Sequence, residues 1–422
     1  MFSAITQAAA ANARTVGIFA HRTELIAQIS RALRQFDVPH GIIAAGTRMA
    51  PGQRVYVCSA QTYARRIGKA PTFDLGIVDE AHHCTEDNTW GECIAASPNA
   101  RWLGVTATPE RLDGKGLGKV FDAMVLGPTP RELTEAGALC KARVFAPSTI
   151  DTSKIRIVAG DFSVGALAEA ADKPSITGDA VSHYARLVKG APSIAFCVSV
   201  AHARHVAEQF RAAGYVSASV DGRMTREARA EVMDDFAAGR INVLTSCALV
   251  SEGLDVPGVH GAILLRPTQS VALYLQQVGR ALRPCDGKDS AVILDHAGNT
   301  QRHGMPDADR AWSLDGSSKS KRAASDTIKQ CPSCYAAYAL GPSACPECGY
   351  VPVSVEPEPL QVVDGELVEV TSAPAMDYGA RMKQQASAVS LNELILLATQ
   401  RGYRNPAGWA RHVMAARFSK RQ

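Results

Sequence analysis

The sequence predicts an α/β protein with two tandem doubly wound parallel-sheet domains, followed by a small cysteine ribbon and a short helical tail. Residues 15–147 and 174–300 each alternate short apolar runs with stretches in which apolar residues recur at helical spacing. Such alternation favours parallel strands joined by crossover helices. A length of 422 residues exceeds what one hydrophobic core usually organises, so we expect two or three domains.

The first domain is expected over residues 1–147. Its helix, Thr23–Phe36, carries apolar residues three and four positions apart, beginning with Leu25. Four apolar or β-branched runs bounded by loop residues predict its strands. They are Thr15–Ala20, Arg54–Ser59, Phe73–Val78 and Trp102–Val105.

The second domain is expected over residues 174–300, after a linker at 148–173. The predicted strands are Ile194–Val198, Ser217–Val220, Ile241–Leu244 and Gly261–Leu265. The predicted helices are Val200–Ala213, Thr225–Ala237 and Ser270–Leu282. Two similar blocks in tandem favour a binding cleft between them.

Beyond residue 300 the strand–helix alternation ends. Residues 301–328 finish in a Ser/Lys/Arg-rich run typical of a linker, and a cysteine ribbon is expected at 329–351. Residues 352–388 are acidic and contain prolines, so we expect them to be flexible. Residues 389–422 form a basic tail, in which two short helices are expected around Gly402–Pro406.

The composition narrows the function classes. A net charge of +4 and a pI near 8.5 permit nucleic-acid binding without establishing it. No apolar run approaches the roughly 18 residues of a membrane span, and no signal-peptide pattern follows Met1. Seven of the eleven cysteines are scattered singly, which suits a reducing compartment. We therefore expect a cytoplasmic protein without a membrane partner.

Three motifs carry the chemistry. The apolar run Phe73–Val78 ends in Asp79-Glu80-Ala81-His82, and two adjacent carboxylates at a strand end can serve a hydrated Mg²⁺ and a nucleophilic water. Thr106-Ala107-Thr108-Pro109 follows, and Gln276-Gln277-Val278-Gly279-Arg280-Ala281-Leu282-Arg283 lies in the second block. Taken singly, these could be a surface carboxylate pair, a turn and a solvated basic helix end. Their order along the chain favours a common site.

Over roughly residues 1–300 the chain resembles superfamily 2 helicases, most closely the DEAH-type group that contains XPB-type repair helicases and phage and prophage helicases. The resemblance implies two RecA-like domains and an ATP- and Mg²⁺-dependent helicase or translocase. DNA is the expected substrate, RNA is not excluded, and phage replication or repair proteins are candidate partners. No G-x-x-x-x-G-K-[ST] phosphate loop occurs in the 422 residues.

The resemblance also implies roles for single residues. Asp79 would hold Mg²⁺ through water, Glu80 would orient or deprotonate the attacking water, and Arg280 and Arg283 would act as arginine fingers. The residues implied in nucleotide binding are His82, Gly253, Asp255, Gln276 and Gly279. The residues implied in holding the nucleic-acid backbone are His21, Arg22, Gln61, Thr62, Ser199 and Thr245.

Two C-x-x-C knuckles separated by ten residues have the spacing of a tetrahedral structural Zn²⁺ site. The expected ligands are Cys331, Cys334, Cys345 and Cys348. Redox-active pairs are the competing interpretation, which is weaker because the knuckles lie outside a βαβ unit. The ribbon is expected either to grip DNA or a partner, or to staple a small fold.

The tail admits two interpretations. Its basic residues, interleaved with Tyr403, Trp409 and Phe418, can hold phosphates and stack on bases. Equally, Trp409, Val413 and Phe418 can pack a short helix against the rest of the chain. A non-catalytic nucleic-acid-binding protein that uses the ribbon and this tail is therefore the alternative function.

The absent phosphate loop bears on where translation starts. Residues 1–11 and 15–20 match the helix and strand that follow this loop in the family. The strand before the loop is normally central in its sheet, and its loss would leave neighbouring ladders unpaired. We therefore expect the natural product to begin upstream of Met1. The alternative is a truncated prophage gene, whose product would be inactive.

Overall fold

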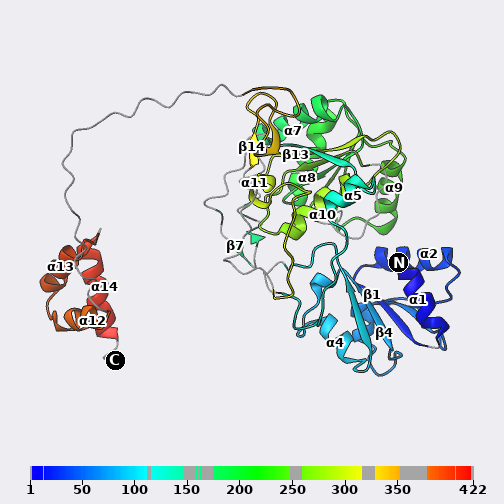
Figure 1. Ribbon diagram of the computed structural model, residues 1–422, viewed down its shortest axis with the longest axis horizontal. Helices are drawn as coiled ribbons and strands as arrows, with labels where there is room; N and C mark the ends of the chain where they lie inside the picture. The colour runs from blue at the N-terminus through cyan, green and yellow to red at the C-terminus, as the bar shows by residue number, and fades with distance from the viewer. Residues whose placement is uncertain are drawn as a thin grey trace. The chain divides into compact units, whose positions relative to one another are not determined.

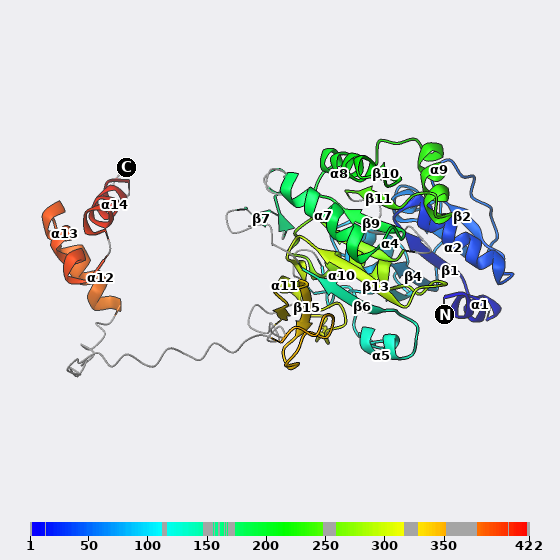
Figure 2. The ribbon, with the colours of Figure 1, turned by 90° about the horizontal axis from the view of Figure 1, so that it is seen from above.

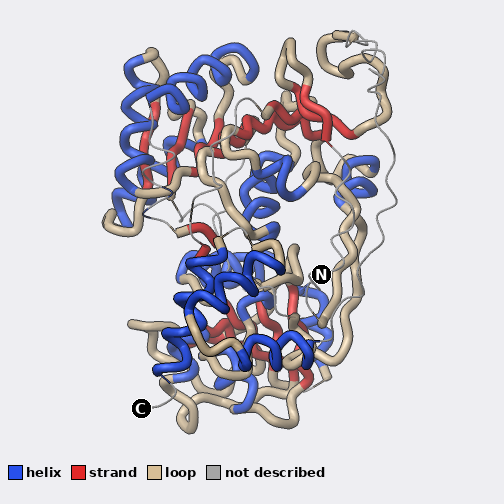
Figure 3. Tube along the Cα trace, turned by 90° about the vertical axis from the view of Figure 1, so that its left-hand side faces the viewer, coloured by secondary structure: helices blue, strands red, loops and turns tan. Residues whose placement is uncertain are grey.

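A computed structural model of the protein describes residues 2–12, 14–111, 116–146, 155, 157–158, 161–163, 165, 167, 174–247, 259–315, 328–351, 378–403 and 405–419. The chain divides into two compact units, Met1–Val353 and Ser354–Gln422. The first unit contains two separate sheets of largely parallel strands with helices packed on them, drawn in red and blue in Figure 3. We call the parts built on these sheets the first lobe and the second lobe. The predicted α/β class with two parallel-sheet domains is confirmed.

The first lobe is built on five parallel strands in the order β2-β3-β1-β4-β5. The strands are β1 (Val16–Ala20), β2 (Gly41–Ile43), β3 (Val55–Ser59), β4 (Leu75–Asp79) and β5 (Arg101–Val105). The helices are α1 (Phe2–Ala11), α2 (Thr23–Gln35), α3 (Ala60–Ala64), the 3-10 turn η1 (Ala81–His83) and α4 (Thr89–Ala95). Figure 1 shows α1, α2 and α4 around β1 and β4.

Two apolar clusters hold the first lobe together, one on each face of its sheet. Phe19 belongs to one cluster and Ile18 to the other, because successive side chains of a strand point to opposite faces. The Phe19 ring meets the rings of Tyr63 and Phe73 edge-on, with centroids 5.1 and 5.6 Å apart. This packing fixes β1 and β4, whose carboxyl ends carry the predicted site.

The second lobe is built on eight strands in the order β10-β11-β9-β12-β13-β6-β15-β14, of which the first six are parallel and the last two antiparallel. The strands are β6 (Lys141–Phe145), β9 (Ser193–Phe196), β10 (Ser217–Val220), β11 (Val243–Ser246), β12 (Gly261–Leu264), β13 (Ser290–Asp295), β14 (Ile328–Gln330) and β15 (Ala336–Ala339). The helices are α5 (Pro130–Glu135), α7 (Pro174–Leu187), α8 (Val200–Ala212), α9 (Arg226–Ala237), α10 (Val271–Leu282) and α11 (Asn299–His303).

Two of the predicted domain boundaries differ from the structure. β6 was expected in the first domain, yet it pairs with β13 of the second sheet, and Figure 2 shows the cyan β6 beside β13 and β15. The cysteine ribbon was expected as a separate module, yet its hairpin β14–β15 extends the same sheet through β15 and β6. Strand pairing, which local sequence does not encode, decides both cases.

Polar contacts between described residues join the lobes within the first unit. The Arg229 guanidinium in α9 lies 3.0 Å from the Glu24 carboxylate in α2, and these helices lie side by side in Figures 1 and 2. The backbone N–H of Gly118 donates to the carbonyl of Leu314 at 2.9 Å. The segment that leads from the first lobe to the second therefore runs beside the segment that follows α11.

The second unit contains α12 (Tyr378–Ser387), α13 (Leu391–Gln400) and α14 (Pro406–Ser419). α13 and α14 are the two helices predicted for the tail, and their packing buries Leu394 and Ala410. α12 is a correction, because residues 352–388 were expected to be flexible throughout. Among the helices of the described ranges, none is long and apolar enough to cross a membrane.

Candidate active site

The predicted carboxylate pair lies at the carboxyl end of β4. Asp79 is the last residue of the strand, and Glu80 adopts a left-handed backbone conformation with φ +53°. A non-glycine residue held there costs on the order of 1 kcal/mol or more, and such strain occurs mainly at functional sites. The turn directs the Glu80 N–H onto the Asp79 carboxylate at 3.1 Å. The conformation of Glu80 thus fixes the two carboxylates relative to each other.

Burial shifts the protonation equilibrium of the Asp79 carboxyl. It raises the pKa of the Asp79 carboxyl above its ordinary value, an effect opposed by the Glu80 N–H and by the nearby His21. A divalent cation at this carboxylate would reverse this shift by stabilising the charged form. Two carboxylates at one strand end supply the hard oxygen ligands that Mg²⁺ prefers, so the residues present fit the predicted ion.

His82 connects the carboxylate turn to the Thr106-Ala107-Thr108-Pro109 segment. The Thr106 hydroxyl donates to the Thr108 carbonyl at 3.0 Å, so its oxygen accepts from His82 Nδ1, also at 3.0 Å. Nδ1 lies 3.3 Å from the Glu80 carboxylate as well. A proton on Nδ1 satisfies both contacts. His82 therefore couples Glu80 to the loop that follows β5.

His21 and Arg22, predicted to hold nucleic acid, lie at the start of α2 against the same turn. The His21 ring packs edge-on against His83 with centroids 5.1 Å apart, and Arg22 Nε lies 3.2 Å from His21 Nε2. Arg22 occupies the N-cap position of α2, where backbone N–H groups favour an anion. The structure thus brings His21 and Arg22 next to the carboxylate turn.

The second predicted contact segment forms the start of α3. The Ser59 hydroxyl caps this helix by accepting from the Thr62 N–H at 3.4 Å. Thr62 is buried, whereas the adjacent Gln61 is exposed. Of this predicted pair, Gln61 has the side chain that is accessible to a nucleic acid.

Ser199 and Thr245 of the second lobe, both predicted to hold the nucleic-acid backbone, lie in different surroundings. Ser199 caps α8 by accepting from the His202 N–H at 3.1 Å, which places it at a helix N-terminus suited to phosphate. Thr245 is 0% exposed inside β11 and donates to the Ala203 carbonyl at 2.7 Å. In the structure α8 covers the Thr245 side chain, and its predicted phosphate contact stays a prediction.

Three of the predicted residues share one face of α10, and the fourth, Arg283, directly follows its last residue. They follow the 3–4 spacing of a helix face, and each is partly or fully exposed, whereas Val278 and Ala281 are buried in the core. The four are Gln276, Gly279, Arg280 and Arg283. Arg280 therefore lies on the more exposed side of α10, and Arg283 is exposed just past the end of the helix.

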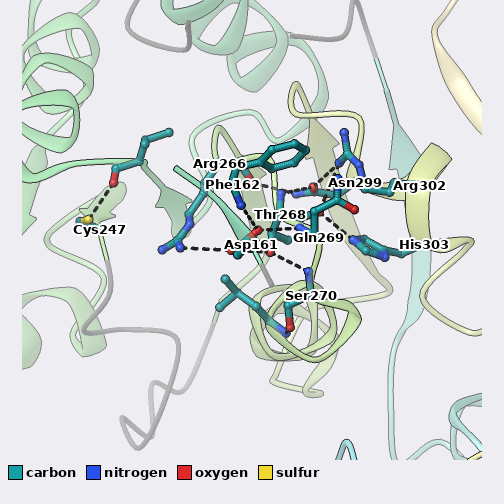
Figure 4. A network of polar contacts seen from close by, with 12 residues as sticks. Asp161, Phe162, Cys247, Arg266, Thr268, Gln269, Ser270, Asn299, Arg302 and His303 are labelled. Carbon is teal, nitrogen blue, oxygen red and sulfur yellow. Dashed lines mark hydrogen bonds and ion pairs between the residues drawn. The ribbon is translucent and has the colours of Figure 1, made fainter. Parts of the chain in front are cut away.

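A polar network that the motifs did not reveal positions the start of α10 (Figure 4). Asp161, in the hairpin of β7 (Ile157–Val158) and β8 (Asp161–Phe162), accepts from the Gln269 N–H at 2.7 Å and from the Thr268 hydroxyl at 3.0 Å. Its carboxylate also lies 3.4 Å from the Arg266 guanidinium. These contacts fix the loop between β12 and α10 from one side.

Helix α11 fixes the same loop from the other side. The Asn299 side chain accepts from the Thr268 N–H at 3.0 Å and donates to the Arg266 carbonyl at 2.9 Å. His303 Nε2 lies 2.9 Å from the Thr268 carbonyl. The Arg302 guanidinium lies over the Phe162 ring at 5.2 Å. The sequence patterns used for the prediction did not indicate this arrangement.

Most of the predicted motif between β11 and β12 lies outside the described residues. Gly253 and Asp255, predicted to approach nucleotide, lie outside the described residues. The adjacent Cys247 is described, and its thiol donates to the Val198 carbonyl at 3.1 Å.

The four predicted metal ligands converge at the ribbon. Their sulfur atoms all lie within 4.8 Å of one another, with Cys331–Cys348 and Cys334–Cys345 each 3.7 Å apart. A tetrahedron with Zn–S bonds of about 2.3 Å has edges of about 3.8 Å, whereas a disulfide requires about 2.05 Å. The geometry therefore fits a Cys₄ metal site and not a pair of disulfides.

The thiols differ in their acidity. Burial acts to raise the pKa of Cys331, but N–H groups of Cys334 and Ser333 outweigh it and lower that pKa to about 7. Burial raises the pKa of Cys334 to about 12. The cluster favours the thiolate form of Cys331 and disfavours the thiolate form of Cys334. All four sulfurs can therefore be thiolates only when a bound cation stabilises their charge.

Comparisons with known proteins agree with the two-lobed architecture described above. Residues 1–111 match the family model "Type III restriction enzyme, res subunit", and residues 179–285 match "Helicase conserved C-terminal domain". The chain is 31% identical over 395 residues to the "51.5 kDa protein" of Lactococcus phage (isolate 7-9), an alignment that covers 91% of this chain and 84% of the relative. The chain belongs to the superfamily 2 helicases.

More distant relatives are longer than this chain. It is 29% identical over 255 residues to the "Putative ATP-dependent helicase IRC3" of Saccharomyces cerevisiae, covering 58% of this chain and 37% of that protein. Among solved structures, a fragment of a "putative HsdR subunit of a type I restriction enzyme" from Vibrio vulnificus has a TM-score of 0.54 at 22% identity, covering 70% of this chain and 55% of the other. This likeness supports the fold alone.

Proposed function

We propose that the protein is an ATP-dependent nucleic-acid motor that acts on DNA. The observation that carries the proposal is the network at the carboxyl end of β4, where Asp79, a strained Glu80, His82 and Thr106 are linked by contacts of 3.0 to 3.3 Å. Nucleotide hydrolysis needs a metal-binding carboxylate and a second group that orients water beside it. Family membership alone would not require this side-chain arrangement.

Each residue of the network has a role in the proposed reaction. Bound Mg²⁺ would neutralise phosphate charge. Asp79 holds the metal's water shell, and Glu80 orients or deprotonates the attacking water. His82 contacts both Glu80 and Thr106, so a movement of the loop after β5 changes the position of the Glu80 carboxylate. Arg280 on α10 and Arg283 just after it stabilise the charge that develops on the phosphate.

The proposed DNA contacts follow from helix starts. Arg22 and Ser199 each stand at the N-cap of a helix, one in each lobe, and Gln61 is exposed beside a third helix start. Oriented N–H groups at such positions bind backbone phosphates without reading sequence. A motor that moves along DNA requires contacts that do not read sequence, because it must bind and release each successive nucleotide whatever its base is.

A Glu80→Gln variant tests the proposal. The variant keeps shape and size but cannot accept a proton from water, so DNA-stimulated ATP hydrolysis should fall by at least about 100-fold while DNA binding is unchanged. Glu86→Gln is the matched control, since Glu86 is an exposed carboxylate six residues away. Both should be measured in the chain together with any in-frame codons that precede Met1. Retained turnover in Glu80→Gln would refute the role of Glu80.

The basic helical part of the second unit, residues 378–422, favours a second candidate function, non-catalytic nucleic-acid binding. Residues 378–422 carry eight Lys or Arg and one acid, Glu393, so their net charge is +7. Because the whole chain carries +4, the preceding residues sum to −3. The Tyr403 and Trp409 rings also meet, with centroids 5.2 Å apart, beside Arg401 and Arg411. Salt-sensitive DNA binding that needs no ATP, lost after charge reversal at Arg401 and Arg411, would support this function.

A further inference from the structure

The cysteine ribbon shares a sheet with the second lobe. β15 pairs antiparallel with β6, with Ala336 opposite Phe145 and Ala337 opposite Val144, and β6 pairs in parallel with β13. One C-x-x-C knuckle precedes β15 and the other follows it. The two knuckles that carry the four sulfurs therefore flank, in the sequence, a strand that belongs to the sheet of the second lobe.

The ribbon also shares the hydrophobic core of that lobe. Cys331 and Cys345, 0% and 2% exposed, belong to the same apolar cluster as Phe145, Tyr184 and Leu294. Ala336 and Tyr338 of β15 complete the cluster on the ribbon side. A metal that gathers these thiolates would order part of this core, because two of its ligands are core residues.

Polar contacts from the ribbon converge on β6 and the residue after it. Arg143 donates from Nε and one terminal nitrogen to the Glu347 carboxylate of the second knuckle, at 2.9 and 2.7 Å. The Ala146 N–H donates to the Tyr335 carbonyl beside the first knuckle at 3.0 Å, and the Gln330 side-chain amide donates to the Ala146 carbonyl. Both knuckles are therefore tied to the strand that enters the 147–173 segment.

A ribbon of this size cannot fold independently without a bound metal or other support. Residues 328–351 are far fewer than the roughly 40 that a metal-free domain usually needs to bury a core. Their order must come from the bound metal and from the sheet edge together. By the same linkage, β6, the strand that pairs with the ribbon, gains order from the metal-bound ribbon.

We propose that one Zn²⁺ held by Cys331, Cys334, Cys345 and Cys348 is a structural part of the second helicase lobe, which it stabilises through β15 and β6. The ribbon is thus not a separable nucleic-acid-binding finger. Loss of the metal, by chelation or by oxidation of the thiols, loosens β6 and with it this side of the second lobe's sheet. This inference does not depend on the ATPase assignment.

The test is hydrogen exchange on the full chain with and without zinc. Metal analysis should first show one Zn²⁺ per chain. At free zinc 100 times the dissociation constant, binding shifts a linked opening equilibrium by about 100-fold. Stripping zinc with a chelator under reducing conditions should therefore speed amide exchange in β6 and β15 by about that factor. β1 and β3 of the first lobe serve as the internal control and should not change.

Added zinc and matched variants complete the test. Returning Zn²⁺ to the stripped protein should restore protection of β6, which shows that the chain had not simply misfolded. A Cys345→Ser, Cys348→Ser double variant should behave like the stripped protein, whereas Cys285→Ser, which removes a thiol outside the cluster, should retain zinc and protection. Unchanged exchange in β6 after complete loss of zinc would overturn the proposal, as would a chain that binds no zinc.

Discussion

Replacing Asp161 by alanine should destabilise the second lobe, because Asp161 anchors the loop in front of α10. The substitution removes three hydrogen bonds, from the Phe162 and Gln269 N–H groups and the Thr268 hydroxyl, and an ion pair with Arg266. Thr268 is 0% exposed and the Arg266 side chain 18% exposed, so water cannot fully replace the lost partner. The consequence reaches α10, whose first residues are joined to this loop.

The magnitude follows from the kind of bond. A hydrogen bond to a charged group contributes about 1.5–3 kcal/mol, and breaking a fully buried ion pair costs about 3–5 kcal/mol. The Asp161 side chain is 19% exposed, which moderates both values. We expect Asp161→Ala to lower the free energy of unfolding of the second lobe by about 2–4 kcal/mol. Asp161→Asn, which keeps one acceptor oxygen, should lose about half as much.

Native-state hydrogen exchange measures this free energy lobe by lobe. Asp235→Ala is the matched control, since Asp235 is a carboxylate paired with Arg240 on the exposed surface of the same lobe, where ion pairs contribute about 1 kcal/mol or less. Peptides from β12 and α10 should lose protection in Asp161→Ala and not in Asp235→Ala. A loss below about 0.5 kcal/mol in Asp161→Ala would refute the anchoring role.

Three further predictions concern single side chains. Thr245→Val should cost about 1 kcal/mol of stability, because the Ala203 carbonyl loses its donor; denaturant unfolding measures this, and a loss of DNA affinity without a loss of stability would instead favour the phosphate contact. Mg²⁺ affinity, measured by calorimetry, should begin to fall on acidification at a pH above the ordinary aspartate pKa of about 3.9, because burial raises the pKa of Asp79; Asp79→Asn should abolish the dependence. Burial, with a contribution from His183, lowers the pKa of His296 to about 3, so the unfolded chain binds the extra proton first, and second-lobe stability should fall below pH 6.5 by up to about 1.4 kcal/mol per pH unit. His296→Asn should flatten that slope, and an unchanged slope would contradict the assignment.

The sequence predicted those parts of the fold that local patterns encode. The periodicity of apolar residues placed β1 and β10, and the start of α8, to within one residue. The Asp79-Glu80 pair was predicted at a strand end, which the structure confirms, because a buried apolar run followed by charge marks where a parallel strand leaves its sheet. No strand was predicted at the positions of β2, β6, β7, β8, β13, β14 or β15.

Features that depend on pairing between distant segments were not predictable in this way. β6 follows the first block in the sequence, yet its partner β13 lies about 150 residues further on. The ribbon's spacing predicted its ligands but not the sheet edge that it extends. Thr245 was assigned from a motif, whereas its exposure is decided by α8. Asp161 lies in a short hairpin without periodicity, so only the three-dimensional structure reveals its partners.

The most direct test of the central claim is DNA-stimulated ATP hydrolysis in an Arg280→Ala variant, with Arg240→Ala as a surface control in the same lobe. A two-lobed motor requires a guanidinium of the second lobe to complete a hydrolytic site on the first. Arg280→Ala should therefore lower the stimulated rate by about 10³-fold while leaving DNA binding and the Arg240→Ala rate unchanged. A stimulated rate in Arg280→Ala equal to that of the unmodified chain would contradict the account.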